Sequence, residues 1–140
     1  MSELPFRILQ IDHIGIATSS KDPLAKFFAT LGIPNLGSET IADQHVVTEM
    51  HDVSSIHLEV LNATDEESPI AKFIAKKGEG FHHLAFRVDN LEAALAYLSS
   101  QGIQLIDTKP RKGAGGKLIA FLHPKSTGGI LVELSQIDHA

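Results

Sequence analysis

One segment of the sequence occurs twice, and this internal repeat restricts the possible folds more than any other feature. Residues 11–33 align without a gap on residues 81–103, an offset of 70 positions that places His13 on His83. In both copies, alternating apolar residues give way to apolar residues three and four positions apart, which is typical of a strand followed by a helix. The repeat therefore predicts two copies of one structural module.

The later parts of the two modules also match. The segment IHLEVL at 56–61 aligns with ILVELS at 130–135, which places Glu59 on Glu133. The offset is 74 positions here, so the loops of the second module hold four extra residues. Each module is thus predicted to contain a strand, a helix and about three further strands, with one histidine early and one glutamate late.

Both repeated helices carry boundary signals. Asp22 is the predicted N-cap of the first helix, with Pro23 at its first helical position, and Asn90 is the predicted N-cap of the second. Gly32 and Gly102 follow the ends of the helices, where glycine is favoured. One face of each helix is apolar, which predicts that both helices cover a sheet. These apolar residues are Leu24, Phe27, Phe28 and Leu31 in the first helix, and Leu91, Ala94, Leu95 and Leu98 in the second.

A third helix is predicted between the modules, in the segment SPIAKFIAKKG at about 68–78, with Ser68 as its cap. A chain of 140 residues is long enough to bury about two-thirds of the surface that its unfolded form exposes. We interpret residues 1–140 as a single α+β domain made of two modules, at about 7–66 and 80–137, which this helix links.

Composition excludes several classes of protein. The chain has no cysteine, so disulfides and thiolate metal sites are excluded, and its eight histidines become informative. A net charge of −5 argues against a nucleic-acid surface, and the absence of an 18-residue apolar run argues against a membrane span. The first ten residues do not have the pattern of a secretory signal, so we expect a cytoplasmic location.

The matched histidines and glutamates predict a metal site. A single histidine or glutamate in a strand is usually structural, but two matched pairs in a duplicated chain indicate a site built between the modules. Two neutral imidazoles and two carboxylates balance the charge of a divalent cation, which offsets the cost of burying them. We therefore predict that His13, Glu59, His83 and Glu133 bind one such ion. Nitrogen and oxygen donors suit Co²⁺, Mn²⁺, Ni²⁺, Zn²⁺ or Fe²⁺.

Only one of the adjacent residues His82 and His83 can face this site, because neighbouring strand residues point to opposite faces. The repeat selects His83, since the residue that matches His82 is Asp12. Gly15 and Ala85, two positions after the predicted histidine ligands, are small and leave room beside each imidazole.

Longer motifs resemble those of a known enzyme family. The motifs are IDHIGIA, SPIAKFIAKKGEGFHHLAFRVDNLEAALA, KPRKGAGGK, FLHPKSTGG and LVELSQ. They are similar to motifs of the methylmalonyl-CoA epimerases, members of the vicinal-oxygen-chelate superfamily that includes glyoxalase I. The resemblance covers nearly the whole chain, and its most specific part is the order KPRKGAGGK, HPKSTGG and VEL. It implies two tandem βαβββ modules that form one curved mixed sheet around a metal site.

The resemblance also implies a function. The chain is expected to interconvert the (R) and (S) forms of methylmalonyl-CoA by removing and returning a proton at C2 through a metal-stabilised enolate. Cobalt is the metal commonly associated with the family, and the family's four ligands fall on the four residues named above. Glu133 matches the glutamate that both contacts the metal and transfers protons, so it is the predicted catalytic residue. Small domains of this fold commonly associate, and a homodimer is expected.

The second proton carrier is left open. Some family members have another glutamate on the strand before Glu59, and Thr48 occupies that position here, with Glu49 next to it. A two-residue turn at Val53-Ser54 places Thr48 opposite Glu59, whereas a three-residue turn places Glu49 there. We favour the first register, which leaves Glu49 in solvent. The remaining candidates for this carrier are a water molecule, His45 and His57.

A local run of basic residues follows the second helix and consists of Lys109, Arg111, Lys112 and Lys117. Such side chains form charge-assisted hydrogen bonds with phosphates, so the run is a candidate site for the phosphates of CoA. A flexible hairpin loop with solvated lysines explains the run equally well.

Two other functions use the same donors. One is a glyoxalase I-type lactoylglutathione lyase, which acts on a glutathione hemithioacetal, and the other is a non-catalytic small-molecule binding protein. An oxygenase of this fold would need Fe(II) with two histidines and one carboxylate, and four ligands in two matched pairs argue against it. The expected partner is a small CoA thioester, with no nucleic acid and no membrane.

Overall fold

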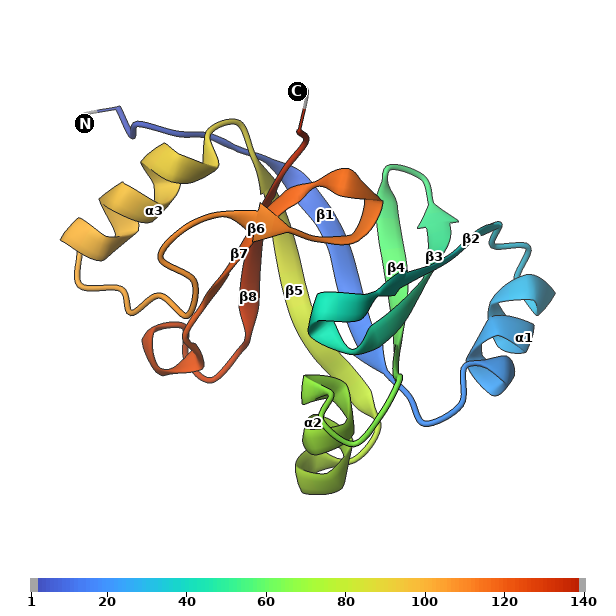
Figure 1. The fold of residues 1–140 in the computed structure, drawn as a ribbon. Helices are drawn as coiled ribbons and strands as arrows, with labels where there is room; N and C mark the ends of the chain where they lie inside the picture. Colours follow the sequence, from blue (N-terminus) through green and yellow to red (C-terminus); the bar gives the residue numbers. More distant parts are fainter. Residues whose placement is uncertain (1–2, 139–140) are drawn as a thin grey trace. The chain divides into compact units, whose positions relative to one another are not determined.

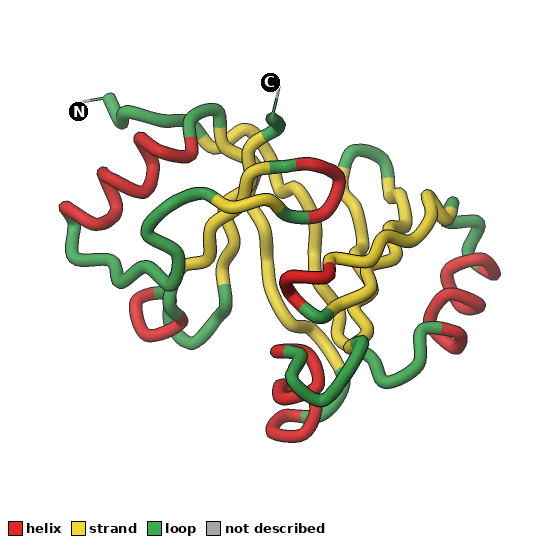
Figure 2. Tube along the Cα trace, in the orientation of Figure 1, coloured by secondary structure: helices red, strands yellow, loops and turns green. Residues whose placement is uncertain are grey.

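A computed structural model describes residues 3–138 of the chain, so the ends of the predicted 1–140 domain lie outside the described residues. The chain forms two compact units. The first unit is His13–His82, and the second combines the N-terminal residues up to Asp12 with the residues from His83 onward. Figures 1 and 2 show the helices and strands of each unit. The interpretation as a single domain stays a prediction.

The first unit contains a four-stranded mixed sheet with the order β2-β3-β4-β1. Strand β1 is parallel to β4, and the other neighbours are antiparallel. Its elements are β1 (Ile8–Ala17, which enters from the second unit), α1 (Asp22–Thr30), β2 (Asn35–Ile41), a 3₁₀ turn (Ala42–Gln44), β3 (Val46–Val53), β4 (Ile56–Ala63) and α2 (Pro69–Lys77).

The second unit repeats this arrangement with the strand order β5-β8-β7-β6. Strand β5 is parallel to β8, and the remaining pairs are antiparallel. Its elements are β5 (Gly80–Val88, which enters from the first unit), α3 (Leu91–Ser100), β6 (Arg111–Lys112), a 3₁₀ turn (Ala114–Gly116), β7 (Leu118–Leu122), a 3₁₀ turn (Pro124–Ser126) and β8 (Val132–Gln136). The predicted repeat of strand, helix and three strands is confirmed.

Most of the predicted helix boundaries are confirmed. The side chain of Asn90 accepts a hydrogen bond from the N–H of Ala93 at the start of α3, and Ser68 accepts one from Ile70 at the start of α2. The prediction for α1 is wrong, because Lys21 is its N-cap residue and no side chain caps the helix. The side chain of Lys21 instead pairs with a carboxylate on the sheet, as described below. None of the described helices is long and apolar enough to cross a membrane.

The two repeated helices differ in how they pack. Leu91, Ala94 and Leu95 of α3 are buried against Ala120 and Leu122 of β7, as their apolar stripe predicts. The same prediction is confirmed only in part for α1, where Phe28 is buried and meets His51 of the sheet. Phe27 and Leu31 are 55% and 59% exposed. Less of this apolar face is buried because the sheet beneath α1 presents the polar side chains of Glu49 and His51 to the helix.

The hairpin between β3 and β4 has a register that we did not predict. Its turn is Ser54-Ser55, closed by the pair Val53 and Ile56, and Met50 lies opposite Glu59. Ser54 has a positive φ of 56°. The predicted turn at Val53-Ser54 would place Val53 at the first turn position, where a β-branched residue with a positive φ is strongly disfavoured. The turn therefore lies one residue later than expected. The two-residue shift in pairing keeps Thr48 on the face of Glu59 and Glu49 on the opposite face.

Glu49 is buried beneath α1, so the prediction that it is solvated is wrong. Its carboxylate accepts a hydrogen bond from the hydroxyl of Ser38 at 3.1 Å and pairs with Nζ of Lys21 at 3.0 Å. Nε2 of His51 lies 2.9 Å from its other oxygen, and the edge of this imidazole meets the ring of Phe28 at 5.0 Å between centroids. A carboxylate with three partners thus occupies a place that apolar residues fill beneath α3.

The partners of Glu49 decide its charge state. Burial by itself raises the pKa of this carboxyl, but the hydrogen bonds and the positive charge of its partners outweigh that effect. The pKa of Glu49 is therefore below its ordinary value. Since the folded-state pKa is depressed, the contribution to stability is complete above the ordinary carboxyl pKa and is lost as the pH falls through the folded-state value.

We predict that Lys21→Met lowers the free energy of unfolding by about 1 kcal/mol at pH 7, because a buried carboxylate loses its cationic partner while Lys21 itself is partly exposed. Urea unfolding measures the change. Lys26→Met removes an exposed lysine from the same helix and is the matched control. The difference between the two variants should shrink below pH 4, and an equal difference at pH 3 and pH 7 would contradict the assignment.

Candidate metal centre

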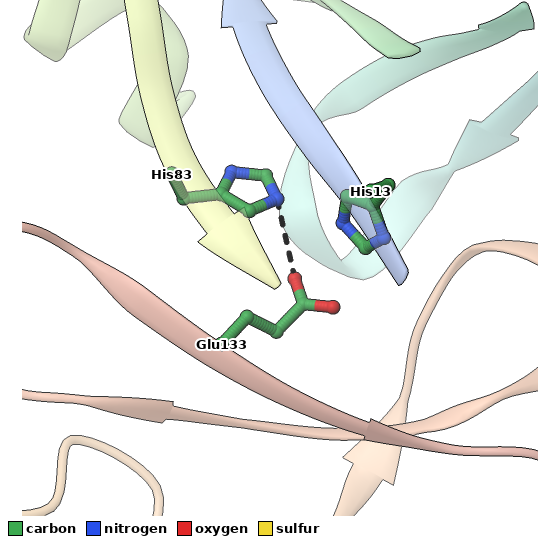
Figure 3. Close-up of side chains that lie close together, drawn as sticks. All are labelled: His13, His83 and Glu133. Atoms are coloured by element: carbon green, nitrogen blue, oxygen red, sulfur yellow. Dashed lines mark ion pairs between the residues drawn. The ribbon is translucent and has the colours of Figure 1, made fainter. Parts of the chain in front are cut away.

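The second unit holds one of the two predicted histidine–glutamate pairs. His83 on β5 and Glu133 on β8 are both buried, and Nε2 of His83 lies 3.4 Å from Oε1 of Glu133 (Figure 3). The two strands are parallel neighbours, and Glu133 is paired with Ala85. The glutamate therefore lies beside the position two residues after the histidine.

The first unit holds the other pair with the same geometry. His13 on β1 and Glu59 on β4 are buried, and Nε2 of His13 lies 3.6 Å from Oε1 of Glu59. These strands are also parallel neighbours, and Glu59 is paired with Gly15. Because the spacing and the strand pairing recur, the repeat places one imidazole and one carboxylate together in each unit.

The chemistry of the two pairs fits a divalent cation. Each pair offers an imidazole nitrogen and a carboxylate oxygen, the donor set that first-row divalent metals accept. Distances of 3.4 and 3.6 Å are longer than the 2.7–2.9 Å typical of a direct charge-assisted hydrogen bond. A cation bound by both donors of a pair would offset the lost hydration of its buried carboxylate.

Neighbouring side chains hold the imidazole of His83 in place. The ring of Phe121 on β7 meets it edge to face, with 5.5 Å between ring centroids and an interplanar angle of 84°. The guanidinium of Arg111 lies 5.7 Å from the centroid of Phe121, and its Nε pairs with Asp107 at 3.2 Å. Packing on one side of the imidazole restricts its rotation, which favours a fixed direction for Nε2.

His82 has a different environment from His83. Its imidazole meets the ring of Phe73 on α2 edge to face, with 4.9 Å between centroids. Burial lowers the pKa of His82 to about 4, so the ring is neutral at physiological pH. A neutral imidazole packed against a helix indicates a structural role for His82. The choice of His83 as the metal ligand stays a prediction, which the internal repeat supports.

The structure narrows the candidates for the second proton carrier. Glu49 lies on the face of the first unit's sheet opposite Glu59 and is already bound by three partners, so it is excluded. His45 ends a 3₁₀ turn and bonds Asp65 at 2.9 Å, and this hydrogen bond raises the pKa of His45. His57 shares the face of Glu59 on β4 and lies 3.7 Å from Asp52. A water molecule and His57, which lies on the same face of β4 as Glu59, remain candidates for the second proton carrier.

Two members of the basic run are already paired within the second unit. Nζ of Lys117 lies 2.6 Å from Oδ1 of Asp12, and Arg111 pairs with Asp107. The positive charge of Lys117 is compensated by the buried carboxylate of Asp12. Lys117 is therefore a poorer candidate for binding the phosphates of CoA. Lys109 and Lys112 are the other two members of the run.

Comparison with known proteins adds independent information. Residues 12–121 match the family model of the glyoxalase/bleomycin resistance protein/dioxygenase superfamily. The human mitochondrial methylmalonyl-CoA epimerase is 33% identical over 129 residues, which cover 91% of this chain and 73% of the human protein.

Two solved structures are similar over nearly the whole chain. Methylmalonyl-CoA epimerase from Mycobacterium tuberculosis has a TM-score of 0.89 at 34% identity and covers 94% of this chain and 89% of its own. A variant of the Streptomyces coelicolor enzyme, in complex with 2-nitronate-propionyl-CoA, has a TM-score of 0.88 at 36% identity, with 95% and 97% covered. The predicted fold class, an α+β fold of tandem βαβββ modules, is confirmed.

We predict that His83→Ala lowers the affinity for a divalent metal by at least about 100-fold, because the loss of a ligand should exceed the 10- to 100-fold effect of losing an outer hydrogen-bonding partner. Elemental analysis after dialysis against a limiting metal concentration measures bound metal per chain. His82→Ala is the control and should retain wild-type metal content. Full metal loading of His83→Ala together with metal loss in His82→Ala would overturn the assignment.

Proposed function

Because the chain belongs to the glyoxalase/bleomycin resistance protein/dioxygenase superfamily, we propose that it is a metal-dependent epimerase that interconverts the (R) and (S) forms of methylmalonyl-CoA. The observation that carries the proposal is similarity to methylmalonyl-CoA epimerases over nearly the whole chain. The complex of the Streptomyces coelicolor relative with a nitronate analogue supports a propionyl-type CoA thioester as the substrate class. The proposed enzyme is therefore an isomerase that acts on a CoA thioester.

The proposed metal ligands are His13, Glu59, His83 and Glu133. Their support is the recurrence of the same buried pair in both units and the nitrogen and oxygen donors that they supply. A bound divalent ion supplies Lewis-acid chemistry, which withdraws charge from the oxygens of the substrate. Cobalt is the proposed ion, with manganese, nickel, zinc and iron as alternatives.

Glu133 is the proposed base. The proton at C2 of methylmalonyl-CoA lies between a thioester and a carboxylate, and its removal leaves an enolate that must be reprotonated on the other face. General acid–base catalysis of this kind needs a group within hydrogen-bonding reach of the carbon-bound proton. Glu133 is buried on β8, and its carboxylate is close to His83, so its position is set by two adjacent strands.

Two further predictions from the sequence, a homodimer and a cytoplasmic location, remain proposals. Members of this fold commonly associate, which supports the first, and light scattering of the purified protein measures its mass in solution.

We predict that Glu133→Gln lowers kcat for epimerisation by about 10²- to 10⁴-fold, the usual contribution of a positioned acid or base. Glutamine keeps the size of the side chain, so the thermal unfolding temperature should change little. Chiral analysis of methylmalonyl-CoA over time measures the rate. Epimerisation at the wild-type rate in this variant would end the assignment of Glu133 as the base.

We also predict that the wild-type protein exchanges the C2 proton of methylmalonyl-CoA with solvent deuterium, because removal and return of that proton are separate steps. Mass spectrometry of the recovered thioester measures the exchange. A non-catalytic binding protein would show binding without exchange. A glyoxalase I-type lyase would convert methylglyoxal plus glutathione and leave the thioester unlabelled.

A further inference from the structure

A buried carboxylate outside the predicted ligand set has two cationic partners in the second unit. Asp12 is 0% exposed. Its Oδ2 accepts a hydrogen bond from Nε of Arg87 at 2.8 Å, and its Oδ1 accepts one from Nζ of Lys117 at 2.6 Å. The partners come from β5 and from the residue before β7. We call these three residues the Asp12 cluster.

The internal repeat shows that the fold does not require polar residues at the places of Arg87, Lys117 and Ser135, whereas the equivalent of Asp12 is the polar residue His82. Arg87 is paired with Ser135 on neighbouring parallel strands. The equivalent pair in the first unit is Ala17 and Leu61, which belongs to a buried apolar core. Polar side chains in one module thus replace apolar side chains in the other.

The same replacement occurs on the antiparallel strands. Phe121 opposite Glu133 corresponds to Met50 opposite Glu59, so Lys117 corresponds to Val46. Val46 is buried in the same apolar core as its neighbours in the first unit. The hydroxyl of Ser135 is buried and has no hydrogen-bond partner among the described residues. An apolar core would fill these positions at lower cost.

Replacing a buried ion cluster by apolar residues of similar volume is often neutral or stabilising. Retention of the Asp12 cluster therefore points to a task other than stability. Asp12 directly precedes His13, the proposed ligand of the first module, and it is the last residue of the N-terminal segment that joins the second unit. The cluster holds the backbone from which His13 extends.

We infer that Asp12, held by Arg87 and Lys117, is a positioning residue for His13. The inference rests on the proposed metal site. Both carboxylate oxygens of Asp12 are occupied by charged donors from two different elements, so its side chain has one preferred direction. Fixing this side chain restricts the backbone at Asp12 and the direction in which His13 leaves the strand.

The loop between β6 and β7, which carries Lys117, contains three glycines that allow a tight turn. The N–H of Gly113 donates to the carbonyl of Lys117 at 2.9 Å. A Cβ at Gly113 would lie 2.8 Å from the side chain of Ile119, so only glycine fits without displacement of that side chain. Gly115 and Gly116 have positive φ values of 71°, which allow the tight turn before Lys117. The loop therefore delivers the ammonium group to Asp12.

The test compares metal affinity with stability in Lys117→Met, Lys117→Arg and Lys112→Met. Lys117→Met is expected to weaken Co²⁺ binding by about 10-fold, the lower end of the effect of removing a group that orients a ligand. Lys117→Arg keeps the charge and is expected to restore the affinity to within about 2-fold of wild type. Lys112→Met removes a charge from the same loop and is expected to leave affinity unchanged. Competition with a chelator measures the affinity, and thermal unfolding measures the stability.

A second variant separates positioning from folding. Asp12→Leu/Arg87→Ala/Lys117→Val/Ser135→Leu replaces the four polar residues with apolar ones, and the last three changes introduce the residues found at the equivalent places in the first unit. Its unfolding temperature is expected to match or exceed that of the wild type. Its metal affinity is expected to fall as in Lys117→Met. Wild-type metal affinity in either variant would overturn the positioning role while leaving the proposed function standing. Failure of the wild-type protein to bind Co²⁺ would overturn both.

Discussion

The cost of burying two carboxylates is the constraint on which the rest of the structure depends. Glu59 and Glu133 are both buried, and the carboxylate of each lies 3.6 or 3.4 Å from Nε2 of the histidine in its own unit. A buried carboxylate without compensation shifts its pKa or destabilises the fold. Under the proposed function, a divalent cation bound by these donors would offset that cost and would supply the Lewis acid that proton transfer at a carbon centre needs. The burial of the two carboxylates and the proposed chemistry would then depend on the same four side chains.

Duplication explains why each unit carries an equivalent histidine–glutamate pair, and the two copies differ in the residues around these pairs. The layer beneath α3 is apolar, with Ala120 and Leu122, whereas the layer beneath α1 contains Glu49 and His51. The core around Ala17 in the first unit is replaced by the Asp12 cluster in the second unit. Each unit therefore has one apolar and one polar layer, in opposite places.

The repeat allowed the main features of the fold to be predicted from sequence, because it fixes which residues are equivalent without knowledge of contacts. The order of elements and the caps at Asn90 and Ser68 follow from local signals. Glu49 and the turn at Ser54-Ser55 were missed for different reasons. A shift of one residue in a turn depends on which residue accepts a positive φ, and burial of Glu49 depends on partners from α1 and β2 that are distant in sequence. The sequence shows Asp12 only as the residue equivalent to His82. Its cationic partners could not be predicted, because Arg87 and Lys117 lie 75 and 105 residues away.

X-ray absorption spectroscopy of the Co²⁺-loaded protein distinguishes one ion bound by both histidine–glutamate pairs from two separate ions, because it counts the imidazole ligands of each bound ion. The account predicts one ion per chain whose coordination shell contains two imidazole nitrogens and carboxylate oxygens. Two ions per chain, each with one imidazole, would mean that the two histidine–glutamate pairs act separately, and the account would be wrong.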